Sequence, residues 1–270
     1  MENCKIIAIA NQKGGTGKTT TAYNLGTALA EAGRKVLLVD NDPQTNLTTA
    51  FGIESPDTLP ITLHEILTST IDDKELPEKS QYILHGEKLD LIPASINLSV
   101  TEINLRDEMG GEHALSTLLE PLREDYEYII IDTNPYLGLL TINALAACDS
   151  VIIPVSPQLW SATGLTALLN TIIKVKKRIN PKITVSGILV TMTSENTVLH
   201  REAMELVDEY FKEKVKIFSA QIPMSTKVGR ANFYSRSVLD FDSKNKAAVA
   251  YAALAKEVID SGKHKHTATA

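Results

Sequence analysis

The sequence predicts an α/β fold, with a doubly wound and mainly parallel sheet flanked by helices. Short apolar, β-branched runs recur along the chain, and several are apolar on both faces, as strands in a covered parallel sheet are. The segments between them place apolar residues three and four positions apart, which is typical of amphipathic crossover helices. A glycine-rich segment, NQKGGTGKTT at residues 11–20, follows the first run directly. Strand, glycine-rich turn and helix in this order are the parts of a phosphate-binding P-loop.

The expected strands are short runs bounded by polar or turn-forming residues. In chain order they are KIIAIA (5–10), KVLLVD (35–40), LDLIPA (89–94), YEYIIID (126–132), SVIIPV (150–155), ITVSGILV (183–190) and VKIFSAQIP (215–223). The expected crossover helices cover residues 19–34, 112–125, 165–179, 197–214 and 244–262. Residues 53–82 contain three prolines, so we expect an inserted excursion there with one short helix near Leu63 to Leu67.

Length and composition limit the class of protein. With 270 residues, 43% hydrophobic and 22% charged, the chain is expected to form one domain over residues 1–262. The small, polar stretch at 263–270 is expected to be disordered. Because no apolar run approaches a membrane span and no leader pattern opens the sequence, we expect a cytoplasmic protein. Cys4 and Cys148 are too few for a disulfide framework and are expected to be reduced and buried.

Charge is unevenly distributed along this acidic chain, whose formal net charge is −6. Residues 1–170 hold 10 Lys and Arg against 23 Asp and Glu, whereas residues 171–246 hold 14 against 8. The basic third is therefore the place from which the chain would approach a polyanion. A solvated helical face is the alternative interpretation of these charges.

The P-loop supplies most of the predicted nucleotide contacts. Backbone amides of the loop and the start of the following helix face a polyphosphate in such a turn. Lys18 is expected to reach the β- and γ-phosphates, Thr19 to ligate Mg²⁺, and Thr20 to contact the α-phosphate. The loop residues predicted to bind the nucleotide are Lys13, Gly14, Gly15, Thr16, Gly17, Lys18, Thr19 and Thr20.

The loop departs from the strict pattern, because Gln12 stands where its first glycine belongs and Lys13 follows. The segment KGGTGKTT resembles the deviant Walker A loop of the ParA/MinD superfamily. The resemblance implies an ATP-sandwich homodimer in which Lys13 crosses to the partner's phosphates, where an added cation would stabilise the transition state. Without the resemblance, Lys13 would be interpreted as a solvent-facing lysine.

Three aspartates lie at the ends of predicted strands: Asp40 and Asp132 each end a strand, and Asp42 lies two residues beyond Asp40. Asp40 and Asp42 lie in KVLLVDNDPQTN, which resembles the family's switch I; this implies that Asp42 orients or deprotonates the attacking water. Asp40 is expected to support Mg²⁺ through water or to hold the loop, the alternative for both being a turn cap beside Pro43. Asp132 resembles the Walker B aspartate and is expected to reach Mg²⁺ through water.

The segment after Asp132 departs from the family, and other segments indicate which nucleotide base is bound. The family usually continues after the Walker B aspartate with two prolines and Ser-Leu-Gly, whereas this chain has TNPYLG, with Asn134 and Tyr136 at the changed positions. No Asn-Lys-x-Asp segment occurs, which favours ATP over GTP. By resemblance, adenine is placed near Thr191, Met192 and Pro223.

The segment from Ile222 to Ile259 resembles the C-terminal part of ParA and Soj proteins, which implies DNA binding by basic residues of this region. Contacts of this kind would be salt-sensitive and independent of base sequence. Phe233 and Tyr234 lie among these residues and are expected to pack under the loop rather than on bases, and Trp160 is interpreted similarly. The candidates for DNA contact are Lys227, Arg230, Arg236, Lys244, Lys246, Lys174, Lys176, Lys177, Arg178 and Arg201.

Together the resemblance implies a short, Soj-like partitioning ATPase without an N-terminal DNA-reading extension. Its cofactors would be ATP and Mg²⁺, and it would associate with nucleoid DNA and a ParB-like centromere-binding partner. Two alternatives belong to other classes. One is a MinD-like membrane regulator, disfavoured because GKHKHTATA lacks large apolar residues; the other is a metabolic P-loop enzyme of the same superfamily.

Overall fold

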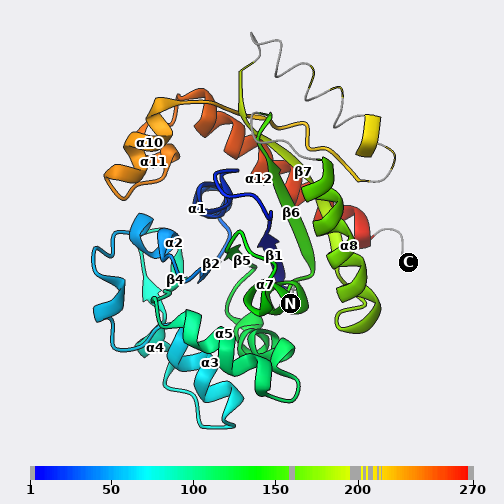
Figure 1. The fold of residues 1–270 in the computed structure, drawn as a ribbon. Helices are drawn as coiled ribbons and strands as arrows, with labels where there is room; N and C mark the ends of the chain where they lie inside the picture. The colour runs from blue at the N-terminus through cyan, green and yellow to red at the C-terminus, as the bar shows by residue number, and fades with distance from the viewer. Residues whose placement is uncertain are drawn as a thin grey trace.

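A computed structural model describes residues 4–157, 162–194, 215–266 and six positions between 202 and 213. Its centre is an eight-stranded sheet in the order β3-β4-β2-β5-β1-β6-β7-β8 (Figure 1). All neighbouring strands are parallel except β3, which runs antiparallel to β4 at one edge. The predicted α/β fold with a mainly parallel sheet is confirmed. The strands are β1 (Lys5–Ile9), β2 (Val36–Asn41), β3 (Leu84–His85), β4 (Asp90–Ile92), β5 (Tyr128–Thr133), β6 (Ser150–Val155), β7 (Thr184–Thr193) and β8 (Ile222–Pro223).

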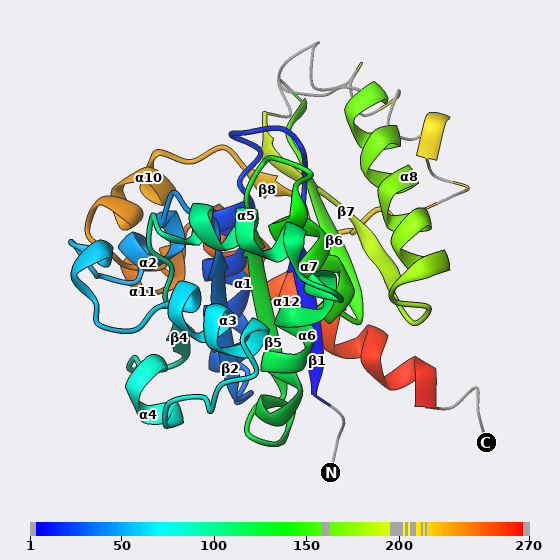
Figure 2. The same ribbon diagram turned by 60° about the horizontal axis from the view of Figure 1, so that its bottom comes forward.

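Helices cover both faces of the sheet, as Figures 1 and 2 show. They are α1 (Lys18–Glu31), α2 (Asn46–Ala50), α3 (Leu63–Ile71), α4 (Lys79–Tyr82), α5 (Leu98–Asp107), α6 (Ala114–Leu119), α7 (Leu139–Ala147), α8 (Ala162–Arg178), α10 (Thr226–Phe233), α11 (Val238–Phe241) and α12 (Lys246–His266). Short 3-10 helices occur at Pro56–Thr58, Gly111–His113 and Glu120–Glu124. Among the described residues, no helix combines the length and apolarity that crossing a membrane requires.

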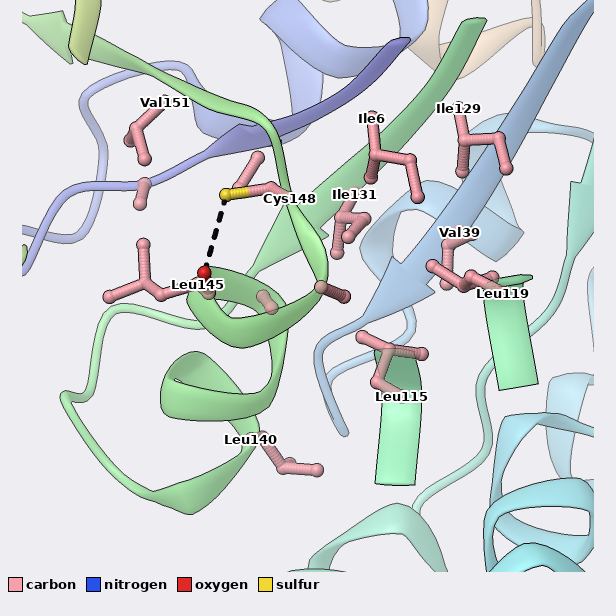
Figure 3. Packing of buried hydrophobic residues seen from close by; sticks show 14 of the residues in the cluster. Ile6, Val39, Leu115, Leu119, Ile129, Ile131, Leu140, Leu145, Cys148 and Val151 are labelled. Atoms are coloured by element: carbon pink, nitrogen blue, oxygen red, sulfur yellow. Dashed lines mark hydrogen bonds between the residues drawn. The ribbon is translucent and has the colours of Figure 1, made fainter. Parts of the chain in front are cut away.

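The sheet separates two hydrophobic cores because successive side chains of a strand point to opposite faces. Leu37, Val39 and Ile129 belong to the core under α3, α5, α6, α7 and α8. Leu38 and Ile130 belong to the core under α1, α11 and α12. Figure 3 shows the first core, where strand side chains meet Leu115 and Leu119 of α6 and Leu140 of α7.

Both cysteines are reduced and buried, as expected. The Cys148 thiol contacts the carbonyl oxygen of Leu145 at 3.7 Å (Figure 3). Burial raises the pKa of Cys4 to about 12 and raises that of Cys148 as well. Neither thiol is suited to nucleophilic chemistry.

The run at 215–223 does not form the single strand that its composition predicts. The Ile188 amide of β7 donates to the Lys216 carbonyl at 2.8 Å, and the Phe218 amide donates to the Ile188 carbonyl at 2.9 Å. Beyond these two bonds the segment does not pair with β7 again until β8. The amides of Ser219 and Ala220 donate instead to the carboxylate of Glu257 on α12. A side chain from the last helix thus replaces part of the strand ladder, which apolar patterning alone does not reveal.

Other boundaries differ less from those expected. The predicted excursion at 53–82 contains α3, which runs four residues beyond Leu67, together with the short α4. Helix α12 continues to His266, past the predicted domain end at 262. The predicted helix at 197–214 falls mostly outside the described residues, as do positions 267–270.

The contact of α1 with β2 allows a test of core packing. Gly26 lies so close to β2 that an added Cβ would approach Leu38 Cδ2 at 2.7 Å, and Leu38 itself is fully buried. We expect Leu38→Ala to lower the free energy of unfolding by about 2–5 kcal/mol, measured by urea denaturation, because it leaves a cavity. The exposed control Val249→Ala should change it by less than about 0.5 kcal/mol. Equal effects of the two substitutions would contradict this packing.

Candidate nucleotide site

The glycine-rich loop joins β1 to α1 at the carboxyl edge of the sheet. Gly15 and Gly17 have φ values of 75° and 84°, a left-handed conformation that favours glycine. Gly17 is the residue before the first turn of α1, so the loop turns sharply into the helix start. Free backbone amides at such a helix N-terminus form a site for anions.

Hydrogen bonds within the loop hold the backbone of Lys13 in place. The Asn11 side chain donates to the carbonyl of Pro154 at 2.6 Å and accepts from the Lys13 amide at 3.0 Å. The Lys13 carbonyl accepts from Lys18 Nζ and from the Thr16 hydroxyl, each at 3.3 Å. The Lys13 residue is exposed, and it forms no ion pair with another described residue. A fixed backbone therefore presents a free ammonium group outward.

A cavity of about 480 Å³ lies in front of the loop. Most of the predicted P-loop residues line it, together with Asp42 and Met192. Sequence reasoning missed its other walls, which come from α1, α2, α10 and the loop after β5. The lining residues are Gly14, Gly15, Gly17, Lys18, Thr19, Thr20, Tyr23, Asp42, Gln44, Asn46, Thr49, Ala50, Pro135, Met192 and Asn232.

Lys18 and Asp132 form the charged floor of the site. Burial lowers the pKa of Lys18, while the charges of Asp132 and Asp42 oppose that shift. Burial raises the pKa of Asp132 well above its ordinary value near 3.8, and the charge of Asp40 adds to this effect. Thr19 and Lys18 act in the opposite direction. The cation and the carboxylate therefore stabilise each other's charged form only partly.

The Asp132 carboxylate fits a role in holding Mg²⁺. Both its oxygens are buried, and neither has a hydrogen-bond partner within the described part of the chain. Thr19, which lines the cavity, adds a hydroxyl oxygen, and Mg²⁺ prefers such hard oxygen ligands. No three His, Cys, Asp or Glu side chains group as ion ligands among the described residues. Mg²⁺ here would thus depend on phosphate oxygens and water for most of its coordination.

Asp40 lies directly beside Asp132, because the two residues are paired in register on the neighbouring strands β2 and β5. One of its oxygens accepts from the Thr48 amide at 2.8 Å and the Thr48 hydroxyl at 2.7 Å. The other accepts from the Asp42 amide at 3.3 Å. Burial raises the pKa of Asp40 to about 6. Of its two expected roles, these contacts favour holding the loop over supporting Mg²⁺.

Asp42 lies beyond the strand end and lines the cavity. One of its oxygens accepts from the Gln44 amide at 2.9 Å, which fixes the carboxylate in the loop. Burial raises its pKa, and the Gln44 amide and Lys18 counteract this. A partly buried carboxylate that faces the phosphate loop is suited to orient a water molecule.

Of the three residues expected near adenine, Met192 lines the cavity, whereas Thr191 and Pro223 do not. The Thr191 hydroxyl donates to the Thr16 carbonyl at 2.8 Å, which ties β7 to the P-loop. Met192 has a left-handed φ of 54° where the register between β7 and β8 shifts, and its side chain lies over Gly17. Pro223 pairs with Thr193 but does not line the cavity.

Asn134 takes over a structural role at the position where the family usually has a proline. Its carbonyl oxygen accepts from the Tyr136 amide at 3.2 Å and the Thr141 hydroxyl at 2.9 Å. These bonds close the turn before α7, while Tyr136 stays exposed. The loop between β5 and α7 is therefore shaped by an amide side chain.

The candidate DNA contacts lie on opposite faces of the sheet. The buried side of α8 packs in one core, so Lys174, Lys176, Lys177 and Arg178 are exposed on that face. Helices α10, α11 and α12 pack in the other core, and Figures 1 and 2 show α8 apart from α10 and α11. Arg230, Arg236, Lys244 and Lys246 are exposed there, and Lys227 is half-buried, 3.6 Å from Asp242. Arg201 lies outside the described residues.

The prediction that Phe233 and Tyr234 pack under the loop is wrong. They are 81% and 57% exposed, because α10 buries only Ala231 fully and its last residues extend away from the core. Tyr234 stacks on Phe241 with ring centroids 6.0 Å apart, and Phe233 meets Tyr234 edge-on. Trp160 falls outside the described residues.

Comparison with known proteins shows the family. A family profile described as "AAA domain" matches residues 4–185. The sporulation initiation inhibitor protein Soj of Bacillus subtilis is 42% identical over 96% of this chain and 99% of its own length. The chromosome partitioning protein ParA of Myxococcus xanthus is 39% identical over 94% of this chain and 88% of its own. The chain belongs to the ParA/Soj family.

A solved relative supports the same fold for this ParA/Soj member. The cobyrinic acid a,c-diamide synthase of Mycobacterium smegmatis, crystallised with an ATP analogue and magnesium, superimposes with a TM-score of 0.83. It is 34% identical, and the match covers 96% of each chain. The ligands of that structure agree with the predicted ATP and Mg²⁺.

Burial of the Asp132 carboxylate is expected to lower the stability of the nucleotide-free protein at high pH. Its folded-state pKa is raised, so its contribution to stability is lost as pH rises above about 3.8. We therefore expect Asp132→Asn to raise the melting temperature of the nucleotide-free protein at pH 8, with a smaller gain at pH 5. Thermal unfolding across this range measures the effect, with exposed Asp72→Asn as control. A destabilised Asp132→Asn protein at pH 8 would contradict the account.

Proposed function

We propose that this ParA/Soj protein is an Mg²⁺-dependent ATPase that forms an ATP-sandwich homodimer and then binds double-stranded DNA without sequence preference. It would act in the cytoplasm, on the nucleoid, with a ParB-like partner that stimulates hydrolysis. The single observation that carries the proposal is the placement of Lys18, Thr19 and Asp42 around one cavity. Asp132 is buried close enough to Lys18 for the two charges to act on each other, and Lys13 is exposed on the loop that lines the cavity.

The residues around the cavity divide the chemistry among them. Lys18, which bonds the Lys13 carbonyl, would exchange that bond for phosphate oxygens. Asp132 and Thr19 would hold Mg²⁺, which neutralises phosphate charge when bound. Asp42 would orient the attacking water, since its carboxylate faces the same space.

Lys13 supports the dimeric part of the proposal. Its carbonyl and amide are both bonded within the loop, so its backbone cannot turn the side chain inward without breaking them. An exposed cation on the phosphate loop could serve another subunit's phosphates, as an arginine finger does. Nucleotide binding and self-association would then be one coupled event.

The DNA-binding part rests on exposed basic residues of α10, of the turns on either side of α11, and of the start of α12: Arg230, Arg236, Lys244 and Lys246. Their charges contrast with the acidic first 170 residues, which would repel a duplex elsewhere. A synthase is a second candidate, favoured by the solved relative of that name. The higher identity to Soj over nearly its whole length supports partitioning instead.

DNA binding in three nucleotide states tests the proposal. We expect binding with ATP but neither with ADP nor without nucleotide, and a steep loss of affinity as salt rises, because bound phosphates release counterions. Lys227→Ala with Arg230→Ala should weaken binding at least about tenfold without changing the nucleotide requirement. Fluorescence anisotropy with unrelated duplexes measures this, with Lys35→Ala and Arg106→Ala together as the charge-matched control, since both residues are exposed and lie outside the basic segment. Equal binding in all three states, or binding to liposomes instead, would overturn it.

The dimer can be tested by comparing two substitutions. Asp42→Ala should retain ATP and accumulate as a dimer, since it removes the water-orienting carboxylate and leaves the interface. Lys13→Ala should retain ATP but remain monomeric, because the cation that crosses between subunits is lost. Light scattering coupled to chromatography gives the mass, and phosphate release gives the rate. An Asp42→Ala protein that hydrolyses ATP at the wild-type rate would contradict the assigned role of Asp42.

A further inference from the structure

The turn between α10 and α11 is joined directly to the nucleotide cavity. The turn, residues 234–238, follows the helix that carries Lys227 and Arg230 and contains Arg236. Ser235 has a left-handed φ of 50°, unusual for a residue with a side chain. Ser237 caps α11 by accepting from the Asp240 amide at 3.1 Å. The conformation of this turn therefore fixes where the basic side chains lie.

A single buried side chain connects this turn to the P-loop helix. Asn24 of α1 is fully buried, and its Nδ2 donates to the Thr20 carbonyl at 2.7 Å. Its Oδ1 accepts from the Val238 amide, also at 2.7 Å. Val238 begins α11, so its amide has no partner within its own helix, and Asn24 supplies one. Thr20, at the other end of this relay, lines the cavity.

A second connection reaches the same turn from α2, the helix that follows the segment resembling switch I. The Ser235 hydroxyl donates to the carbonyl of Thr49 at 3.4 Å, and Thr49 lines the cavity. Thr48, the residue before Thr49, donates from its amide and its hydroxyl to the same oxygen of Asp40. Asn232 of α10 lines the cavity itself. The basic segment is thus attached to both elements that would contact a nucleotide.

We propose that Asn24 is a positioning residue that couples nucleotide occupancy to the placement of the α10–α11 segment. Buried hydrogen bonds are not readily exchanged for bonds to water, so a shift in the first turn of α1 must either be followed by α11 or break one of these two bonds. The proposal deepens the proposed function and rests on it at the DNA end. By linkage, DNA binding strengthens ATP binding by the same factor.

The experiment compares Asn24→Ala with Asn143→Ala. Asn143 is also a fully buried asparagine that bridges two elements, through Leu115 and Gly111, but on the opposite face of the sheet. Two quantities are measured in full-length protein: the ratio of DNA affinities with ATP and ADP, and hydrogen exchange of residues 230–241 with and without a non-hydrolysable ATP analogue. We expect Asn24→Ala to bind ATP within about threefold of wild type, and its affinity ratio to fall at least about fivefold. Asn143→Ala should retain both responses.

The proposal is overturned by an Asn24→Ala protein with the wild-type affinity ratio and exchange response, and also by an equal loss in Asn143→Ala. If Asn24→Ala does not fold, Val238→Pro removes the same bond from the other side. Proline suits this first helical position, because Ser237 before it is extended at φ −67° and ψ 156°. Wild-type protein that binds no DNA but shows nucleotide-dependent exchange at the turn would refute the proposed function alone. ATP-dependent DNA binding with exchange unresponsive to nucleotide would refute the relay alone.

Discussion

The packing of like charges at the carboxyl edge of the sheet is the constraint on which the rest of the site depends. Asp40 and Asp132 are fully buried neighbours on adjacent strands, and only Lys18 and hydrogen bonds oppose their repulsion. Asp40 is compensated by three donors of its own loop, whereas neither oxygen of Asp132 has a hydrogen bond of full geometry within the described residues, and only the nearby Thr19 hydroxyl and Lys18 favour its charged form. A site of this composition is incomplete until a cation and a polyanion enter together, so the binding of Mg²⁺ and a nucleotide would offset the cost of this buried charge.

The parallel sheet makes this arrangement possible. Strands β1, β2 and β5 end at the same edge, so a loop and two aspartates from distant parts of the sequence meet there. The hydrophobic cores on both faces fix the strands and leave the edge to polar residues. Because the aspartates extend strands whose other residues are buried, their carboxylates cannot move away from each other. The cores therefore hold the charges in place.

Much of this was predictable from sequence, since the information was local. Lys18, Thr19 and Asp42 lie at the cavity, as the phosphate-loop motif and the position of the strand ends indicated, and so does Met192, which was placed there by resemblance. The exposure of Phe233 was not predictable, because proximity in sequence to a core helix does not determine which way a short helix faces. Asn24 gave no signal either. Its role depends on a hydrogen bond to a residue 214 positions away, and the amide pattern that matters appears only after folding.

Dimerisation and the Asn24 relay would control DNA affinity through different physical terms. Basic residues lie on both faces of the sheet, so a straight duplex against one face meets only one group per chain. A dimer doubles the number of phosphates neutralised, and this number sets the slope of affinity against salt. The relay changes where existing side chains lie, which alters affinity at a given salt concentration while the number of contacts is kept. Because ATP would drive both, nucleotide dependence alone cannot separate them, whereas the slope of DNA affinity against salt concentration would assign each its share.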